Sequence, residues 1–336
     1  MIGPFLEQSC TLRCLVVNNR WDADERIVSN SLRFLSASLS QFSSLTSVEF
    51  GDCEFSAANV EMLILALRGH SRLSSIDLSN NTVTGGGLAA LASLVSKPKS
   101  FLTHVDLRHC SLDDVGAGIL ASALGRNSTI QHLNLAQNRG ITVTGWRSFS
   151  TVLRNPNSLL ETLNLGFNSI DDDALVSFAS SLANNSKLKE MSILSSTTTF
   201  TRWDALSNAL CNKSSIDATL KSNHTLERID SRLLWSVAES QLPSDLSALL
   251  WMNRAHTKVK AARRKIIKVH FSGKFSMQPF IDMDLKVLPH AISWMAKDGF
   301  GRSPMYQFLR NASFIVDVRG GYKSGNEPKS SKRQKV

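Results

Sequence analysis

Three adjacent carboxylates, Asp171, Asp172 and Asp173, lie in the stretch NLGFNSIDDDALVSF and are the first candidates for chemistry in this chain. Neighbouring carboxylates can hold a divalent cation or share a proton during acid–base catalysis. They can also cap the N-terminus of a helix, where negative charge is favourable. The choice depends on whether the stretch occurs once or is one copy of a repeated pattern.

A glycine-rich segment, VTGGGLAAL from Val83, resembles a phosphate-binding loop because it precedes a helical pattern. The Lys-Ser/Thr pair that completes such a loop is missing from it. The chain also lacks a nucleophile-elbow motif and a metalloprotease helix motif. We therefore expect no enzymatic activity, no catalytic residues, no cofactor and no metal.

A pattern of apolar residues recurs along most of the chain, with apolar residues at positions 1, 4, 6 and 11 and Asn or Cys at position 9. Copies start at Leu45, Leu73, Leu102, Ile130, Leu160, Leu188 and Ile216, separated by 28, 29, 28, 30, 28 and 28 residues, and Leu12 starts an earlier one. Positions 1, 4 and 6 place apolar side chains on one side of a short strand. The second half of each unit has helical periodicity, so stacked units bury their apolar faces together.

These units resemble leucine-rich repeats of the ribonuclease-inhibitor type, from Leu12 to about Leu226, through their length and the alternation of Cys53, Asn81, Cys110 and Asn138. The resemblance implies an α/β leucine-rich-repeat solenoid, an open arc with parallel strands inside and helices outside. We predict an N-terminal cap with a first degenerate repeat at 1–44 and leucine-rich repeats at 45–230. A helical C-terminal region at 231–318 would cap the array, before a disordered basic tail at 319–336.

The repeat changes the interpretation of the three aspartates. Asp171 and Asp172 align with Asp113 and Asp114, whereas the units from Leu45 and Leu73 have Ser, Ala, Thr and Gly at these positions. Because no carboxylate is required there, we interpret all three as helix-capping residues. Gly69, Asn155, Asn184 and Asn212 each follow the last leucine of a helix by two residues, which predicts left-handed helix caps.

The residues between and after the apolar strand positions are expected on the concave face. Glu49, Asp77 and Asp106 would form an acidic column that docks a basic partner, unless the carboxylates are only a solvated face. The complete set of predicted partner-binding residues is Glu49, Asp77, His104, Asp106, Arg108, His132, Asn134, Asn164 and Glu190.

His104 and His132 share one register on neighbouring predicted strands, about 4.8 Å apart. Two histidines so placed are potential zinc or copper ligands, but such a site needs three or four. Asp106 is the only neighbouring candidate for a third ligand. We therefore interpret the histidines as a surface imidazole pair within the partner footprint.

The last third of the chain is strongly basic. Residues 1–230 have a net charge of −2, whereas residues 231–336 have a net charge of +12. One helix is predicted after Pro243, with an apolar stripe that includes Ala255, Val259, Ala262 and Ile266. Its predicted basic patch comprises Lys258, Lys260, Arg263, Arg264, Lys265 and Lys268. The patch would contact phosphate backbones, an acidic protein or an anionic membrane, or would be the solvated side of a capping helix.

The C-terminal tail contains the short basic sequence of Lys332, Arg333 and Lys335, which matches a minimal nuclear-import signal. The start of the chain lacks the pattern of a signal peptide, and no apolar run is long enough to span a membrane. These features predict a cytoplasmic or nuclear protein.

The sequence predicts a non-enzymatic scaffold that binds a protein partner on the concave face of the repeats. One alternative is a nucleic-acid-associated protein that uses the basic C-terminal region. Another is a regulator of a small GTPase, because Ran GTPase-activating proteins share this type of repeat, although their tails are acidic and this tail is basic.

Overall fold

The computed structural model describes residues 12–17, 25–39, 42, 44–98, 100–193, 201–230, 242–270, 289–290 and 293. The described residues divide into two compact units. The first contains 12–212 and 221–262, and the second contains Lys213–Leu220 together with the residues from Arg263 on. The basic tail and its nuclear-import sequence lie outside the described residues.

The first unit is built on one parallel sheet of eight strands, which follow one another in the order of the sequence. They are β1 (Cys14–Val16), β2 (Ser47–Glu49), β3 (Ser75–Asp77), β4 (His104–Asp106), β5 (His132–Asn134), β6 (Thr162–Asn164), β7 (Glu190–Ser192) and β8 (Arg228–Asp230). Each strand pairs in register with its neighbours, so equivalent repeat positions lie side by side. The predicted α/β leucine-rich-repeat solenoid is confirmed.

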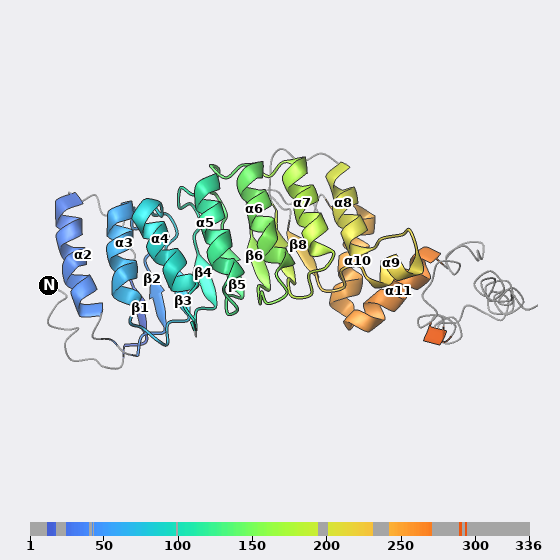
Figure 1. The fold of residues 1–336 in the computed structure, drawn as a ribbon, viewed down its shortest axis with the longest axis horizontal. Helices are drawn as coiled ribbons and strands as arrows, with labels where there is room; N and C mark the ends of the chain where they lie inside the picture. Colours follow the sequence, from blue (N-terminus) through green and yellow to red (C-terminus); the bar gives the residue numbers. More distant parts are fainter. Residues whose placement is uncertain are drawn as a thin grey trace, which may run out of the picture. The chain divides into compact units, whose positions relative to one another are not determined.

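The described helices are α2 (Glu25–Leu39), α3 (Ala57–Leu67), α4 (Gly85–Val95), α5 (Asp114–Gly125), α6 (Val143–Arg154), α7 (Asp172–Leu182), α8 (Thr201–Leu210), α9 (Ile216–Leu220), α10 (Ser244–Ala255) and α11 (Lys258–His270). From α2 to α8 they alternate with the strands and stand beside one another along the sheet (Figure 1). The core between helices and sheet contains the middle residues of β2 to β8, such as Ile76 and Leu133, and helix residues such as Leu63 and Phe149. No helix among the described residues is both long and apolar enough to cross a membrane.

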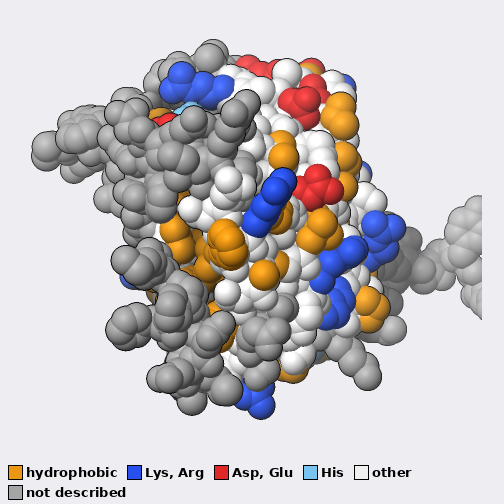
Figure 2. All heavy atoms as spheres, turned by 90° about the vertical axis from the view of Figure 1, so that its left-hand side faces the viewer, with side chains coloured by type: hydrophobic (Ala, Val, Ile, Leu, Met, Phe, Trp, Pro, Cys, Tyr) orange, Lys and Arg blue, Asp and Glu red, His pale blue; other side chains and the backbone are white. Residues whose placement is uncertain are grey.

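The N-terminal end of the array is formed by α2 and β1 (Figure 1). Leu32 and Leu39 of α2 are buried, whereas Phe34 is 78% exposed. In Figure 2, hydrophobic and basic side chains are interspersed over the described part of this end. This mixed surface fits the outer side of a terminal repeat, which has a neighbour on one side only.

Asparagines at position 9 of the repeat join successive turns of the solenoid. The Asn138 side chain is buried and donates to the carbonyls of Leu107 and Leu135 at 2.8 and 2.9 Å. Its Oδ1 accepts from the backbone N–H groups of Cys110 and Leu112. Asn81 likewise donates to Phe50 and accepts from Phe55. An asparagine at position 9 thus bonds backbone groups of its own turn and of the preceding one.

The unit from Ile130 contains one extra residue, and this insertion alters the asparagine ladder. Gly140, in the insertion, forms a parallel bridge with Asp113, and a Cβ at Gly140 would lie 2.9 Å from the Leu112 carbonyl. Asn168, in the following unit, still donates to Leu135 and Leu165. Its buried Oδ1 has no hydrogen-bond partner among the described residues. The insertion lies in the unit that would supply N–H groups to this oxygen, as Cys110 and Leu112 supply them to Asn138.

A second set of buried asparagines connects the helices to the following strands. These asparagines lie outside the positions that define the repeat pattern. Asn127 donates to the Val95 carbonyl and accepts from the N–H groups of Thr129 and Ile130. Asn185 and Asn223 make equivalent bonds in later units. Such an asparagine fixes the end of one turn against the previous helix.

The left-handed caps predicted at Gly69, Asn155, Asn184 and Asn212 are wrong. None of the four has a positive φ, and Asn155 has a φ of −68°. The left-handed residues instead lie just after the strands, at Asp52, Asn80, His109, Gln137 and Phe167, with further ones at Glu54 and Ser111. The tight bend therefore occurs between strand and helix rather than at the end of the helix.

The last repeat predicted from Ile216 is also wrong, because Ile216–Leu220 is helix α9. Strand β8 begins at Arg228, and Leu226 and Ile229 fill the first two apolar positions of this unit. Ser231 stands where the third apolar residue would be. The unit was therefore not recognisable by the apolar pattern.

The single basic helix predicted after Pro243 is interrupted. Helix α10 ends at Ala255, and His256 is extended before α11 starts at Lys258. Ala262 and Ile266 of the predicted stripe are buried, whereas Ala255 is exposed and Val259 is 73% exposed. The predicted stripe through Ala255 and Val259 is therefore wrong.

Candidate functional site

The face of the sheet opposite the helices carries two columns of side chains, because the first and third residues of each strand point away from the buried middle residue. The first column contains Ser47, Ser75, His104, His132, Thr162, Glu190 and Arg228, and the second contains Glu49, Asp77, Asp106, Asn134, Asn164, Ser192 and Asp230. We call these two columns the open face. Eight of the nine predicted partner-binding residues belong to them, and the ninth, Arg108, follows β4.

Most acidic and amide side chains of the second column also stabilise the backbone. Asp77, Asp106, Asn134 and Asn164 each accept a hydrogen bond from the N–H group two residues ahead, at 2.8 to 3.1 Å. These bonds fix the bend after each strand and use one oxygen of each side chain. Asp and Asn are interchangeable in this role, so the charge of Asp77 and Asp106 is additional to it.

Asp106, at the end of β4, is a half-buried carboxyl of the open face. Burial raises the pKa of Asp106, and the nearby charge of Asp77 raises it further. Opposing this, the Asn134 amide donates to its Oδ2 at 2.9 Å. Neighbouring carboxylates on adjacent strands thus repel one another and favour a positively charged ligand.

His104 and His132 form a stacked pair, with ring centroids 4.2 Å apart and an interplanar angle of 17°. The Thr103 hydroxyl donates to the Ser74 carbonyl, so its oxygen accepts from Nδ1–H of His104 at 2.8 Å. The neutral form of His104 therefore has an unprotonated Nε2. Partial burial and the neighbouring His132 lower the pKa of His104.

The stacked geometry does not suit metal binding by this pair. The lone pairs of an imidazole lie in the plane of its ring. In two nearly parallel rings they therefore lie in separate parallel planes, whereas two ligands of one ion must point at the same place. Within the described part of the chain, no group of three or more His, Cys, Asp or Glu side chains is arranged to hold a metal ion. The prediction that His104 and His132 are neighbours on adjacent strands is confirmed.

At the other end of the open face, Glu190 accepts a hydrogen bond from the Arg228 guanidinium at 2.6 Å. Both side chains are partly exposed, so the pair is accessible to a partner. Arg228 was not among the predicted residues, because the last strand was placed too early in the sequence. The open face therefore changes from acidic near β2 to β4 to mixed charge at β7 and β8.

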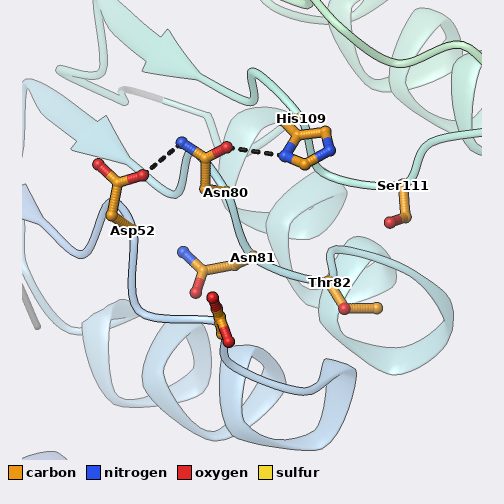
Figure 3. Close-up of a pocket in the computed structure, with 7 residues that line it drawn as sticks. Asp52, Asn80, Asn81, Thr82, His109 and Ser111 are labelled. Carbon is orange, nitrogen blue, oxygen red and sulfur yellow. Dashed lines mark hydrogen bonds between the residues drawn. The ribbon is translucent and has the colours of Figure 1, made fainter. Parts of the chain in front are cut away.

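A polar groove lies beyond the C-terminal ends of β2, β3 and β4 (Figure 3). Its volume is about 380 Å³, and it is lined by Asp52, Glu54, Asn80, Asn81, Thr82, His109 and Ser111. The Asn80 amide donates to Asp52 at 2.7 Å and its oxygen contacts His109 Nδ1 at 2.8 Å. The sequence did not identify the groove, because the side chains converge through left-handed backbone that the apolar pattern does not predict.

The three aspartates that first suggested chemistry lie at the N-terminal end of α7, as predicted, and Asp171 is the N-cap, whereas Asp172 and Asp173 belong to the first turn. Asp171 accepts from the N–H of Ala174, and Asp113 accepts from the N–H of Gly116. Asp173 lies in the first turn of α7 and forms an exposed ion pair with Arg147 at 3.2 Å. Hydrogen bonds from Thr142 lower the pKa of Asp114, which thereby links α5 to the start of α6.

The predicted basic patch is only partly exposed. Lys258, Lys260, Arg264 and Lys268 are exposed, and Arg263 is half-buried. Lys265 is completely buried, so its placement on a solvated face was wrong. Lys258 Nζ donates to the Ser186 carbonyl at 2.7 Å, which holds the start of α11 against the connection before β7.

Comparison with known proteins identifies the repeat. Four segments, 71–92, 99–121, 126–150 and 157–179, match the family model described as Leucine Rich repeat. The chain is 31% identical over 150 residues to NACHT, LRR and PYD domains-containing protein 5 of Mus musculus, covering 45% of this chain and 13% of the relative. It is 31% identical over 146 residues to protein 14 of the same series from Mus musculus, covering 44% of this chain and 15% of the relative.

Among solved structures, the leiomodin-1 actin-binding site 2 matches with 15% identity and a TM-score of 0.35, covering 45% of this chain and 87% of that chain. The chain spans less than a sixth of the length of the two NACHT, LRR and PYD proteins that it matches.

Proposed function

The chain is a leucine-rich repeat protein, and we propose that it is a non-enzymatic scaffold that binds a basic protein partner on the open face of its sheet. The observation that carries the proposal is the alignment of Glu49, Asp77 and Asp106 on three adjacent strands. In Asp77 and Asp106 the bond from the backbone occupies one of the two carboxylate oxygens, Oδ1. Together they form an uninterrupted acidic column, to which a Lys- or Arg-rich segment is complementary.

Two further features support binding at this place. The polar groove after β2 to β4 adds the carboxylates of Asp52 and Glu54 close to the same strands in sequence. The His104–His132 pair adds hydrogen-bonding groups and flat ring faces beside the acidic column. Aromatic faces and fixed polar groups are typical of central contacts in protein interfaces.

The test uses charge removal that keeps the fold. In the triple variant E49Q/D77N/D106N, Asn at 77 and 106 retains the oxygen that bonds the backbone, as Asn134 and Asn164 do in their own strands. The matched control, D173N/D204N/D245N, removes the same number of exposed carboxylates from the first turns of helices.

Each tagged protein is incubated with an extract of cells that naturally contain the protein, and the bound proteins are quantified by mass spectrometry. The proposal predicts partners that bind the wild type and the helix control and are lost with the triple variant. Equal recovery of every bound protein by all three proteins would contradict the proposal that a partner binds the open face.

A further inference from the structure

The connections that lead from each helix back to the next strand lie together on one edge of the sheet, because all strands are parallel. We call this the return edge, and it consists of residues 68–74, 96–103, 126–131, 155–161 and 183–189. Backbone hydrogen bonds join the connections in series, from Thr103 to Ser74, from Gln131 to Thr103 and from Glu161 to Gln131. The return edge is thus one continuous surface.

The return edge is basic. Its described residues include six lysines and arginines, Arg68, Arg72, Lys97, Arg126, Lys187 and Lys189, all of them exposed. They include one carboxylate, Glu161, which is paired with Lys189 at 2.7 Å. On the opposite edge, the five described connections at 50–56, 78–84, 107–113, 135–142 and 165–171 carry four carboxylates, Asp52, Glu54, Asp113 and Asp171, and two arginines. The two edges of the sheet therefore differ in charge, and an anion is attracted to the return edge.

Helix dipoles account for only part of this distribution. A cation directly after a helix complements the negative C-terminal end of the dipole, as Arg68 and Arg126 do. Arg72 and Lys187 each lie five residues beyond the end of their helix, where the dipole has little effect. Their charges therefore need another explanation.

Two cavities open on the return edge between successive connections. The first, of about 360 Å³, is lined by apolar residues that include Leu73, Pro98 and Phe101, and by Lys97. Phe101 is 62% exposed and is the only large exposed hydrophobic side chain in the described part of this edge. The second, of about 680 Å³, is lined by Arg126, Ser128, Asn157 and Lys187. One cavity thus presents an aromatic ring beside a cation, and the other presents two cations with neutral polar groups.

The basic surface continues into α11. The bond from Lys258 Nζ to the Ser186 carbonyl places the first turn of this helix beside the connection that carries Lys187. Lys258 and Lys260 are both exposed. The exposed start of the predicted basic patch and the return edge are therefore parts of one cationic surface.

We propose that the return edge binds single-stranded nucleic acid, with phosphates on Lys97, Arg126 and Lys187 and a base stacked against Phe101. Single-stranded nucleic acids bind to grooves that combine backbone-tracking cations with aromatic stacking surfaces. A duplex hides the faces of its bases, so Phe101 would make no equivalent contact with it. A membrane-binding edge would insert several large apolar side chains, whereas the described part of this edge exposes one.

The test measures binding of fluorescein-labelled twenty-nucleotide oligouridine and oligothymidine to the full chain by anisotropy at several salt concentrations. In K97Q/R126Q/K187Q, we expect at least a tenfold loss of affinity at low salt. The slope of log K against log salt should become shallower by about 2, since each lost phosphate contact contributes about 0.7. F101S should lose about tenfold in affinity with an unchanged slope, because base stacking does not release counterions.

The control variant, R33Q/R139Q/R147Q, removes three exposed arginines from outside the return edge, so it reports the effect of net charge alone. It should bind within about twofold of the wild type. The proposal is overturned if the return-edge variant and the control bind alike, or if the wild type binds vesicles containing one-fifth phosphatidylserine but neither oligonucleotide.

Circular dichroism and the urea midpoint establish that each variant is folded. As a measurement that requires no variant, photocrosslinking of thiouridine-containing oligouridine to the wild type should label peptides that contain residues 97–101 and 126–128. Labelling confined to residues outside the return edge would also overturn the proposal.

Discussion

Two buried asparagines, Asn138 and Asn168, occupy the same position in successive repeats but make different numbers of hydrogen bonds. Asn138 makes five, three as a donor and two as an acceptor. Asn168 makes two, both as a donor. Substitution by alanine removes the same side-chain atoms in both cases. The difference between N138A and N168A therefore reports the two accepting bonds together with one longer donor bond, from Asn138 to the Ala136 carbonyl at 3.3 Å.

In N138A, the buried N–H groups of Cys110 and Leu112 lose their acceptor, and an unsatisfied buried group costs about 1–3 kcal/mol. We expect N138A to lower the free energy of unfolding by about 3–5 kcal/mol, and N168A by about 1–2 kcal/mol. In N168A no backbone N–H is left without its acceptor, since Oδ1 has no hydrogen-bond partner among the described residues.

The assay is urea unfolding monitored by circular dichroism, with the m-value checked for constancy across the variants. N138C is a useful control, because Cys110 fills this position in the neighbouring unit and bonds the Leu78 carbonyl through Sγ at 3.2 Å. N138C should lie between the wild type and N138A. If N168A destabilises the protein as much as N138A, the reasoning about the insertion and the asparagine ladder is refuted.

Three further predictions concern the caps, the imidazole pair and the thiols. D171A should cost about 1 kcal/mol through loss of the α7 cap, whereas D173A, which loses an exposed ion pair, should cost about 0.5 kcal/mol or less in the same urea assay. In NMR titrations the pKa of His104 should lie below 6.5 and should rise in H132Q, because both the burial and the neighbouring imidazole disfavour its charged form; an unchanged pKa in H132Q would contradict this. Since the folded-state pKa is the lower one, the unfolded chain binds more protons, and this group's contribution to stability is lost as the pH falls below 6.5. Burial raises the pKa of Cys110 to about 12, so this thiol should resist a disulfide reagent at pH 8 in the native protein, while exposed Cys14 reacts readily; rapid native labelling of Cys110, identified by mass spectrometry, would disagree.

The solenoid was predictable because its core requires a pattern that repeats along the sequence. Apolar residues at three fixed positions and an Asn or Cys after the strand are enough to place six strands from Leu45 to Leu188. The pattern fails where the physical requirement is weaker, as in the last strand, whose third apolar position is Ser231.

The open face was predictable for a related reason, because strand alternation determines which side chains point away from the core. The stacking of His104 on His132 and the bonds of Asp106 with Asn134 follow from register alone. The groove at Asp52 and His109 was not predictable, since its residues follow the strands through left-handed backbone that non-glycine residues rarely adopt.

Lys265 and the interrupted basic helix show a different limit. The apolar stripe through Ala255 and Val259 assumed one continuous helix, but the extended residue His256 separates α10 from α11, and both side chains are exposed. The break lacks Pro and Gly, and its local signal is Thr257, a residue type favoured at helix N-caps, directly before α11. Lys265 is buried together with Ala262 and Ile266, although helical periodicity placed it in solvent.

The central claim is that a partner binds the open face rather than the helices. The most direct measurement introduces a photoreactive phenylalanine analogue either at Ser75, in the middle of the open face, or at Val176, which is 52% exposed on α7. Our account predicts a covalent adduct with the partner from position 75 and none from position 176. An adduct from position 176 alone would contradict it.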